Sequence, residues 1–224
     1  MDQWPDPDVY VNYMGQSLSG SENRNINRTY PGKADGTLTE MMSYGIVQLI
    51  NTENIDVTVD LHEASPEYPV INALIAHERA MNLASNVVVD MQMEGVQISL
   101  EPSPTDLRGL THRELGDHTD TLALLMEAPN PAQGRLRDRT DEALVLTGKS
   151  ETYVKAGEIG QLYVPYDENG WPIEVRCARH VFGIERILAN YSEMYEEPII
   201  VTGMPSYDEL VKNGMGPYLN EPTT

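Results

Sequence analysis

Apolar residues recur every three to four positions in two segments of the chain, which is the period of an α-helix. The first segment covers residues 37–51, where Thr37 or Thr39 can cap the opening turn. The second covers residues 172–194. A further helix is predicted for residues 78–94. The apolar stripe of the first helix should pack on a sheet.

Short apolar segments between these helices are typical of buried strands. They cover residues 55–61, 69–76, 96–100 and 119–126. Helices that alternate with short apolar strands predict an α/β fold, with a mainly parallel or mixed sheet flanked by helices. His62 follows the first strand and Glu127 follows the last. Because ligands bind beyond the carboxyl ends of such strands, we expect both residues in one shared site.

The remaining segments have weaker patterns. Residues 1–37 are rich in Pro, Gly, Asn, Asp and Ser, which predicts an ordered loop with little regular structure. Residues 132–170 are polar without a clear period, and a short strand followed by a turn or helix is predicted after Pro198. We expect one domain over residues 1–197 and a carboxy-terminal tail over residues 198–224.

Composition limits the partners and the chemistry. Fifteen basic and 35 acidic residues give a net charge of −20, so nucleic acid is a poor partner, and a small anionic substrate would need a local basic pocket. No apolar run reaches the roughly 20 residues that span a bilayer. Cys177 is the only cysteine, which excludes an intrachain disulfide and a cysteine-based zinc site. The sequence predicts no particular compartment.

The first candidate motif is Asp60-Leu61-His62-Glu63, a histidine between carboxylates. Neutral imidazole is a good zinc ligand, and Asp60 could hold its other ring nitrogen and fix the tautomer. For an isolated Asp-x-His motif, a structural pair is the more common alternative.

Glu127 is the second candidate, because it follows a strand of mostly apolar residues. Partial burial there would raise the pKa of its carboxyl group and suit it to general acid–base work. The alternative is a glutamate that only caps the strand or forms a salt bridge.

The third candidate lies in the amino-terminal loop, at Asn27 and Arg28. An arginine held by a turn beside an asparagine amide can grip a carboxylate through paired charge-assisted hydrogen bonds. The alternative is a structural arginine that pairs with one of the many acidic residues.

Four polar residues cluster within one short segment, at His112, Glu114, Asp117 and His118. We expect no helical i, i+4 pair among them, so a solvated loop is favoured over a metal cluster. The two remaining histidines, His77 and His180, are predicted to be structural.

Taken in order, these motifs resemble the zinc carboxypeptidase superfamily, and most of all its succinylglutamate desuccinylase/aspartoacylase branch. The matching residues are Asn27-Arg28-x-Tyr30-Pro31-Gly32, Gly36-Thr37, Asp60-Leu61-His62-Glu63, Glu127 and Arg176-x-x-Arg179-His180-x-x-Gly183-Ile184. They extend over about residues 20 to 195. The resemblance implies a zinc carboxypeptidase-like fold that lacks its first strands, with residues 1–197 as a partial catalytic domain.

The resemblance also implies a role for each matching residue. His62 would be the third zinc ligand, and Glu127 would be the general base that activates zinc-bound water. Asn27 and Arg28 would bind the carboxylate of a small-molecule or peptide substrate. Arg24 is grouped with them as a substitute for the arginine that stabilises the oxyanion in this family.

The implied activity is zinc-dependent hydrolysis of an amide bond next to a carboxylate-bearing group, as in a deacylase or desuccinylase. A metallocarboxypeptidase that trims peptides and a non-catalytic domain that binds acidic ligands are the alternatives. The family takes its first two zinc ligands from a His-x-x-Glu motif upstream of Asn-Arg, and this sequence has no such motif. We therefore expect an amino-terminally incomplete enzyme that is inactive by itself.

Overall fold

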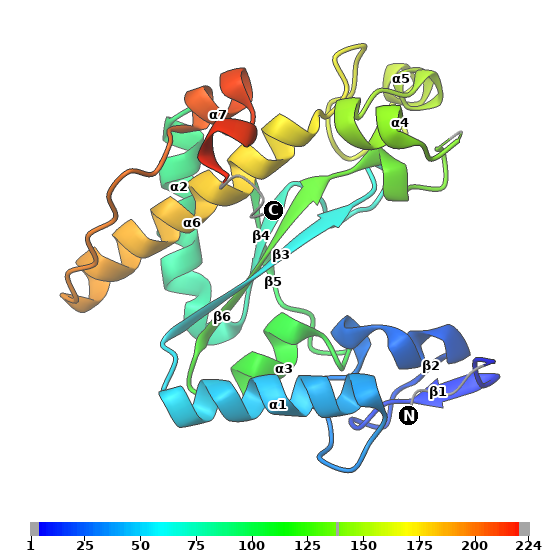
Figure 1. The fold of residues 1–224 in the computed structure, drawn as a ribbon, viewed down its shortest axis with the longest axis vertical. Helices are drawn as coiled ribbons and strands as arrows, with labels where there is room; N and C mark the ends of the chain where they lie inside the picture. Colours follow the sequence, from blue (N-terminus) through cyan, green and yellow to red (C-terminus); the bar gives the residue numbers. More distant parts are fainter. Residues whose placement is uncertain (1–4, 138, 220–224) are drawn as a thin grey trace, which may run out of the picture. The chain divides into compact units, whose positions relative to one another are not determined.

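The main feature of the protein is a four-stranded mixed sheet flanked by helices, with the strand order β3-β6-β4-β5 (Figure 1). The computed structural model describes residues 5–137 and 139–219. The four strands are β3 (Val57–Ala64), β4 (Ala73–Ala76), β5 (Ser99–Pro102) and β6 (Leu122–Pro129). The predicted α/β class, with a mixed sheet between helices, is confirmed.

Backbone hydrogen bonds at both ends of β3 and β6 define how these strands pair. The amide of Leu122 donates to the carbonyl of Asp56 at 2.7 Å, and the amide of Asn130 donates to that of Ala64 at 2.7 Å. The number of residues from Leu122 to Asn130 equals the number from Asp56 to Ala64. The strands therefore run parallel in one continuous register.

The chain forms two compact units, and boundaries between them fall within strands β3, β4, β5 and β6. The first unit contains residues 1–60, 75–82 and 102–125, and the second contains residues 61–74, 83–101 and 126–224. The prediction of a domain over residues 1–197 with a separate tail stays a prediction.

Helix α1 (Leu38–Glu53) in the first unit confirms the first predicted helix. Thr37 Oγ1 accepts a hydrogen bond from the amide of Glu40 at 3.3 Å, and the Glu40 carboxylate accepts one from the amide of Thr37 at 2.9 Å. This reciprocal pair is a capping box, which satisfies two free donors at the start of the helix. The core beneath α1 contains Tyr30, Val47, Ile50, Leu115 and Ala123.

The amino-terminal segment has more regular structure than its composition predicts. Strands β1 (Val9–Val11) and β2 (Ser17–Ser19) pair antiparallel, and the 3-10 helices η1 (Gly20–Arg24) and η2 (Ile26–Arg28) follow. The side chain of Asn12 donates to the carbonyls of Arg28 and Arg108 at 3.2 Å each. Elements of three to five residues are too short to show a hydrophobic period, and contacts from distant segments stabilise them.

Helix α6 (Ile173–Tyr195) confirms the predicted helix at 172–194. Residues 78–93 are also helical as predicted, first as η3 (Glu78–Ala80) and then as α2 (Met81–Met93). In the second unit Gly183 allows α6 to approach β6 closely, because a Cβ atom at this position would lie 2.2 Å from Cε of Met126.

Two short helices, α4 (Glu142–Thr147) and α5 (Glu151–Glu158), occupy the polar segment in which the sequence shows no clear period. Asp141 and Ser150 cap them by accepting hydrogen bonds from backbone amides of the first turn. The η4 turn (Pro131–Gln133) precedes them.

The predicted strand after Pro198 is wrong, because residues 198–206 contain no strand. Ile199, Ile200 and Val201 have high β-propensity, but they are exposed there and no neighbouring strand pairs with them. The helix expected further on is present as α7 (Tyr207–Asn213), which packs on α6 through Tyr207 and Phe182 and precedes η5 (Gly216–Tyr218). Within the described ranges, none of the helices has the length and apolar character needed to cross a membrane.

Candidate functional site

The structure brings His62 and Glu127 together in the second unit. They lie on the neighbouring parallel strands β3 and β6, and Nδ1 of His62 is 3.9 Å from Oε1 of Glu127. Both side chains are partly buried, Glu127 more than His62. The distance exceeds that of a hydrogen bond but suits an ion pair with a protonated imidazole. A carboxylate and an imidazole this close can together handle one proton or one ligand.

Both residues lie inside their strands and not beyond the ends, which corrects the predicted strand boundaries. β3 continues to Ala64 and β6 continues to Pro129. The hydrogen bond from Asn130 to Ala64 extends the ladder past the last apolar residue of each segment. Polar residues can occupy these final strand positions because their side chains find partners.

Glu63 has such partners in the second unit, although the sequence assigned it no role. Its carboxylate accepts a hydrogen bond from Nδ2 of Asn130 at 2.7 Å and another from the guanidinium of Arg176, a buried residue of α6. Successive strand residues point to opposite faces, so Glu63 and His62 use different sides of β3. The sequence evidence for the pair of Glu63 and Arg176 was this alternation along β3, together with an arginine within the apolar stripe of α6.

His180 of α6 also contacts strand β3. Burial lowers the pKa of its imidazole, while the charge of Glu63 and a hydrogen bond to the backbone of His62 act in the opposite direction. Its Nδ1 atom is buried and has no hydrogen-bond partner among the described residues. His180 therefore supports the backbone of the candidate site, in keeping with its predicted structural character.

The described residues do not complete a catalytic zinc site. Such a site normally takes three protein ligands and leaves one position for water or substrate. His62 and Glu127 supply two donor groups, and no cluster of three His, Cys, Asp or Glu residues suited to a metal occurs in residues 5–137 and 139–219. The assignment of His62 as a zinc ligand stays a prediction.

Asn27 and Arg28 lie in the first unit and contact other residues of that unit. Oδ1 of Asn27 accepts hydrogen bonds from the amide of Thr111 at 2.7 Å and from its hydroxyl at 2.8 Å. Nη1 of Arg28 donates to the carbonyl of Asn27 at 2.6 Å, and its Nε is 3.8 Å from Oε2 of Glu22. The Asn27 oxygen thus satisfies a backbone donor at the start of a helix. Substrate binding by both residues stays a prediction.

Arg24 of the first unit binds a carboxylate of the chain itself. Its Nε and Nη2 atoms donate to the two carboxylate oxygens of Asp6, both at 2.8 Å. This bidentate bond lowers the pKa of Asp6. A substrate carboxylate at Arg24 would have to displace Asp6, so the predicted role of Arg24 requires this exchange.

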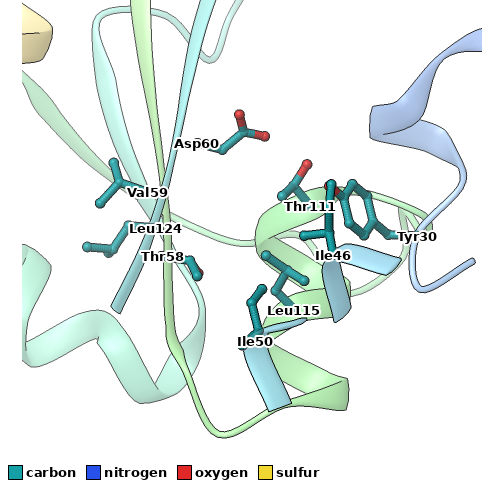
Figure 2. Close-up of a pocket in the computed structure, with 9 residues that line it drawn as sticks. All are labelled: Tyr30, Ile46, Ile50, Thr58, Val59, Asp60, Thr111, Leu115 and Leu124. Atoms are coloured by element: carbon teal, nitrogen blue, oxygen red, sulfur yellow. The ribbon is translucent and has the colours of Figure 1, made fainter. Parts of the chain in front are cut away.

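An open cavity of about 280 Å³ lies within the first unit (Figure 2). Apolar side chains from α1 and from residues 115 and 124 line its walls, and Asp60, Thr111 and Tyr30 lie toward one end. Burial and the charge of Asp60 raise the pKa of Tyr30 to about 12. The Tyr30 hydroxyl therefore stays protonated at neutral pH and adds a polar group to a mainly apolar cavity.

The predicted loop around His112 is wrong, because residues 111–118 form the helix α3 (Thr111–His118). Glu114 is fully buried and accepts two hydrogen bonds from Arg108, both at 2.7 Å. Glu114 and His118 form an i, i+4 pair at 3.2 Å, contrary to the expectation that this segment has no helical pair. Ion pairs within the first unit thus allow a polar sequence to form a buried helix.

Arg113 of the same helix joins two further carboxylates. It donates two hydrogen bonds to Glu78, at 2.9 and 2.7 Å, and one to Asp117 at 2.7 Å. The bonds from Arg113 lower the pKa of Glu78 to about 2. Burial would raise the pKa of Asp117, but hydrogen bonds from Arg113 and His77 bring it below its usual value.

Acid should weaken this cluster. A carboxyl group with a lowered pKa in the folded state stabilises the fold above its unfolded pKa, and this contribution is lost as pH falls through the folded pKa. For Glu78 the interval runs from 4.5 down to about 2. We expect the stability difference between the wild type and Glu78→Gln, measured by urea unfolding, to shrink across this interval. Comparison with the variant cancels the general effect of net charge. A stability difference that does not change with pH would contradict the lowered pKa of Glu78.

Comparison with protein-family models, curated proteins and solved structures finds no match to this chain. The resemblance to zinc carboxypeptidases therefore depends on the short motifs and on the placement of His62 beside Glu127.

Proposed function

We propose that the chain contributes to zinc-dependent hydrolysis of an amide bond next to a carboxylate-bearing group, in a zinc carboxypeptidase-like fold. Glu127 is the general base, and His62 is a metal ligand. The observation that supports this proposal is the 3.9 Å approach of the two side chains on adjacent parallel strands. Zinc would supply electrophilic assistance, and its site requires ligands in addition to those described.

Glu127 is suited to the base role by its position. Its carboxylate is mostly buried beside an imidazole near the carboxyl end of β6, where a strand and not a mobile loop holds it. A carboxylate in such a place can take a proton from an attacking water and deliver it to the leaving amine. Rigid strands also hold the acceptor oxygen in one orientation, which proton transfer requires.

Zinc binding tests the role of His62 without relying on activity. With an incomplete ligand set, we expect weak binding in competition with a chromophoric chelator. His62→Ala should abolish this binding, whereas Glu127→Gln should leave it nearly unchanged. His118→Ala in the first unit is the matched control and should bind as the wild type does. One tightly held equivalent of zinc on the wild type, or unchanged binding by His62→Ala, would contradict the proposal.

Hydrolysis tests the role of Glu127 and the substrate class. The test uses a protein that also supplies the remaining zinc ligands, because this chain is expected to be inactive by itself. With zinc in excess, release of amine from N-succinyl and N-acetyl amino acids is compared with release of the terminal residue from peptides. Glu127→Gln should reduce the rate by about 10²–10⁴-fold, the usual contribution of a general base. Glu193→Gln, an exposed change on α6, is the control. Preference for peptides would favour a metallocarboxypeptidase, and full activity of Glu127→Gln would exclude the base assignment.

A further inference from the structure

The side chain of Asn130 joins the carboxyl ends of β3 and β6 in the second unit. Asn130 is buried, and its Nδ2 atom donates to Oε2 of Glu63 at 2.7 Å. Its own backbone amide donates to the carbonyl of Ala64 at 2.7 Å. The Oδ1 atom of Asn130 accepts from the amide of Ala132 at 2.9 Å. The side-chain amide is therefore fixed in one orientation, with its donor toward β3 and its acceptor toward the chain that follows β6.

These contacts lie next to the two residues of the candidate site. Glu63 follows His62 directly, and Asn130 comes three residues after Glu127. In a parallel ladder a carbonyl accepts from the amide one position past the residue opposite it, and the bond from Asn130 to Ala64 defines this register. Two residues before Ala64, His62 therefore lies opposite Glu127. Successive strand residues point to opposite faces, so Glu63 and Asn130 meet on the face away from this pair.

A link of this kind matters at β3 because β3 is an edge strand. In the described sheet β6 is its one neighbour, whereas β6 lies between β3 and β4. Ladder bonds hold an edge strand from one side, so its end opens locally more readily than the end of a central strand. Buried Arg176 of α6 holds the Glu63 carboxylate from a second direction. The carboxylate thus connects the end of β3 to α6 through Arg176 and to β6 through Asn130.

We propose that Asn130 is a positioning residue, which holds β3 against β6 and thereby keeps His62 beside Glu127. This role rests on the proposed function, whereas the geometry of the pair can be measured without zinc or turnover. A misplacement of about 1 Å can lower a catalysed rate by about 10²-fold, so a base and a metal ligand on two different strands need a fixed separation. Asparagine suits the position, because an aspartate of the same shape could accept from Ala132 but could not donate to Glu63.

A disulfide between residues 62 and 127 measures this geometry. His62→Cys and Glu127→Cys are combined with Cys177→Ala, which removes the only native cysteine. Opposite residues of neighbouring strands are about 4.8 Å apart, a separation that a disulfide spans. The equilibrium between the two thiols and the disulfide in glutathione buffers reports how well the two positions are held together. At a pH well below the thiol pKa both states are uncharged, so a charge introduced nearby has little direct effect on this equilibrium.

Asn130→Asp should lower the equilibrium constant for the disulfide by at least about tenfold, because it sets a second carboxylate against Glu63 and a disulfide tolerates little deviation in geometry. Adding Glu63→Gln should restore the constant, since glutamine can donate to the new carboxylate and still accept from Arg176. Asn130→Ala removes the donor without adding a charge. It should give the same loss, and it provides the test if the aspartate variant does not fold.

Arg186→Met on α6 is the matched control in the second unit. It breaks ion pairs with Glu94 and Glu185 and leaves the bond between Asn130 and Glu63 intact, so it should not change the constant. An unchanged constant in both Asn130 variants, no recovery on adding Glu63→Gln, or an equal loss in Arg186→Met would overturn the positioning role. If the disulfide responds as expected while zinc binding and hydrolysis fail, Asn130 still sets the geometry and the proposed function alone is wrong.

Discussion

Replacing Arg176 with methionine is expected to lower the free energy of unfolding by about 3–5 kcal/mol, because it removes the buried arginine from an ion pair and from two further hydrogen bonds. Arg176 is 2% exposed, and its guanidinium donates to Glu63 and to the carbonyl of Val145. Its Nε atom donates to the carbonyl of Trp171 at 3.1 Å. Methionine fills much of the same volume but donates none of these bonds, so three acceptors, one of them charged, lose a donor.

Urea unfolding followed by the fluorescence of Trp171 measures this loss, in a Trp4→Phe background that leaves one tryptophan. For a chain of this size the melting temperature should fall by about 6–20 °C. Arg186→Met is the matched control on the same helix. Arg186 pairs with Glu94 at 3.4 Å and with Glu185 at 2.6 Å, and its side chain is 23% exposed, against 2% for Arg176. That change should cost about 1 kcal/mol or less, and equal losses for the two variants would contradict the special role of Arg176.

The Arg176–Glu63 pair illustrates why the ends of the strands were predicted less well than the helices. Helices α1 and α6 repeat an apolar period over many residues, and this local pattern predicts them directly. The end of β3 depends on a partner 113 residues away, because Glu63 can occupy a strand only where Arg176 meets it. The residues next to Glu63 in the sequence do not identify this partner.

Helix α3 was missed for a related reason. Its residues 111–116 are all buried although most are polar, so its sequence lacks the apolar stripe that indicates a packed helix. Arginine and carboxylate side chains compensate one another there. The i, i+4 spacing of Arg113 and Asp117 was readable from the sequence, whereas the bonds to Glu78 and Arg108 connect α3 to other segments.

The candidate site was predictable to the extent that it depends on parallel strands. His62 and Glu127 each follow an apolar strand segment, and parallel pairing of the strands brings the two side chains together. The bond between Arg24 and Asp6 had no such pattern, because it joins the last residue of η1 to a residue 18 positions earlier in an acidic chain. Any of the 35 acidic residues could have been its partner on sequence grounds.

Replacing Glu114 with glutamine should cost about 3 kcal/mol, the second large effect expected. Glu114 is fully buried, and its carboxylate accepts hydrogen bonds from Arg108 and, at 2.9 Å, from the amide of Gly109. Glutamine keeps the shape and can still accept from Gly109, so the loss reports mainly the charge. Removing one member of a buried ion pair leaves the other uncompensated, although partial exposure of Arg108 moderates the penalty.

A double variant separates this mechanism from simple damage to the core of the first unit. If the cost of Glu114→Gln comes from the uncompensated guanidinium, adding Arg108→Met should recover most of the lost stability, because no charge then remains at the buried end. Asp120→Asn removes the same charge from a fully exposed position near α3 and should change stability by no more than about 0.5 kcal/mol. Urea unfolding of the wild type, the single variants Glu114→Gln and Arg108→Met, and the double variant measures this cycle. If the stability losses of the two single variants add up in the double variant, Glu114 acts through packing and not through its bond to Arg108.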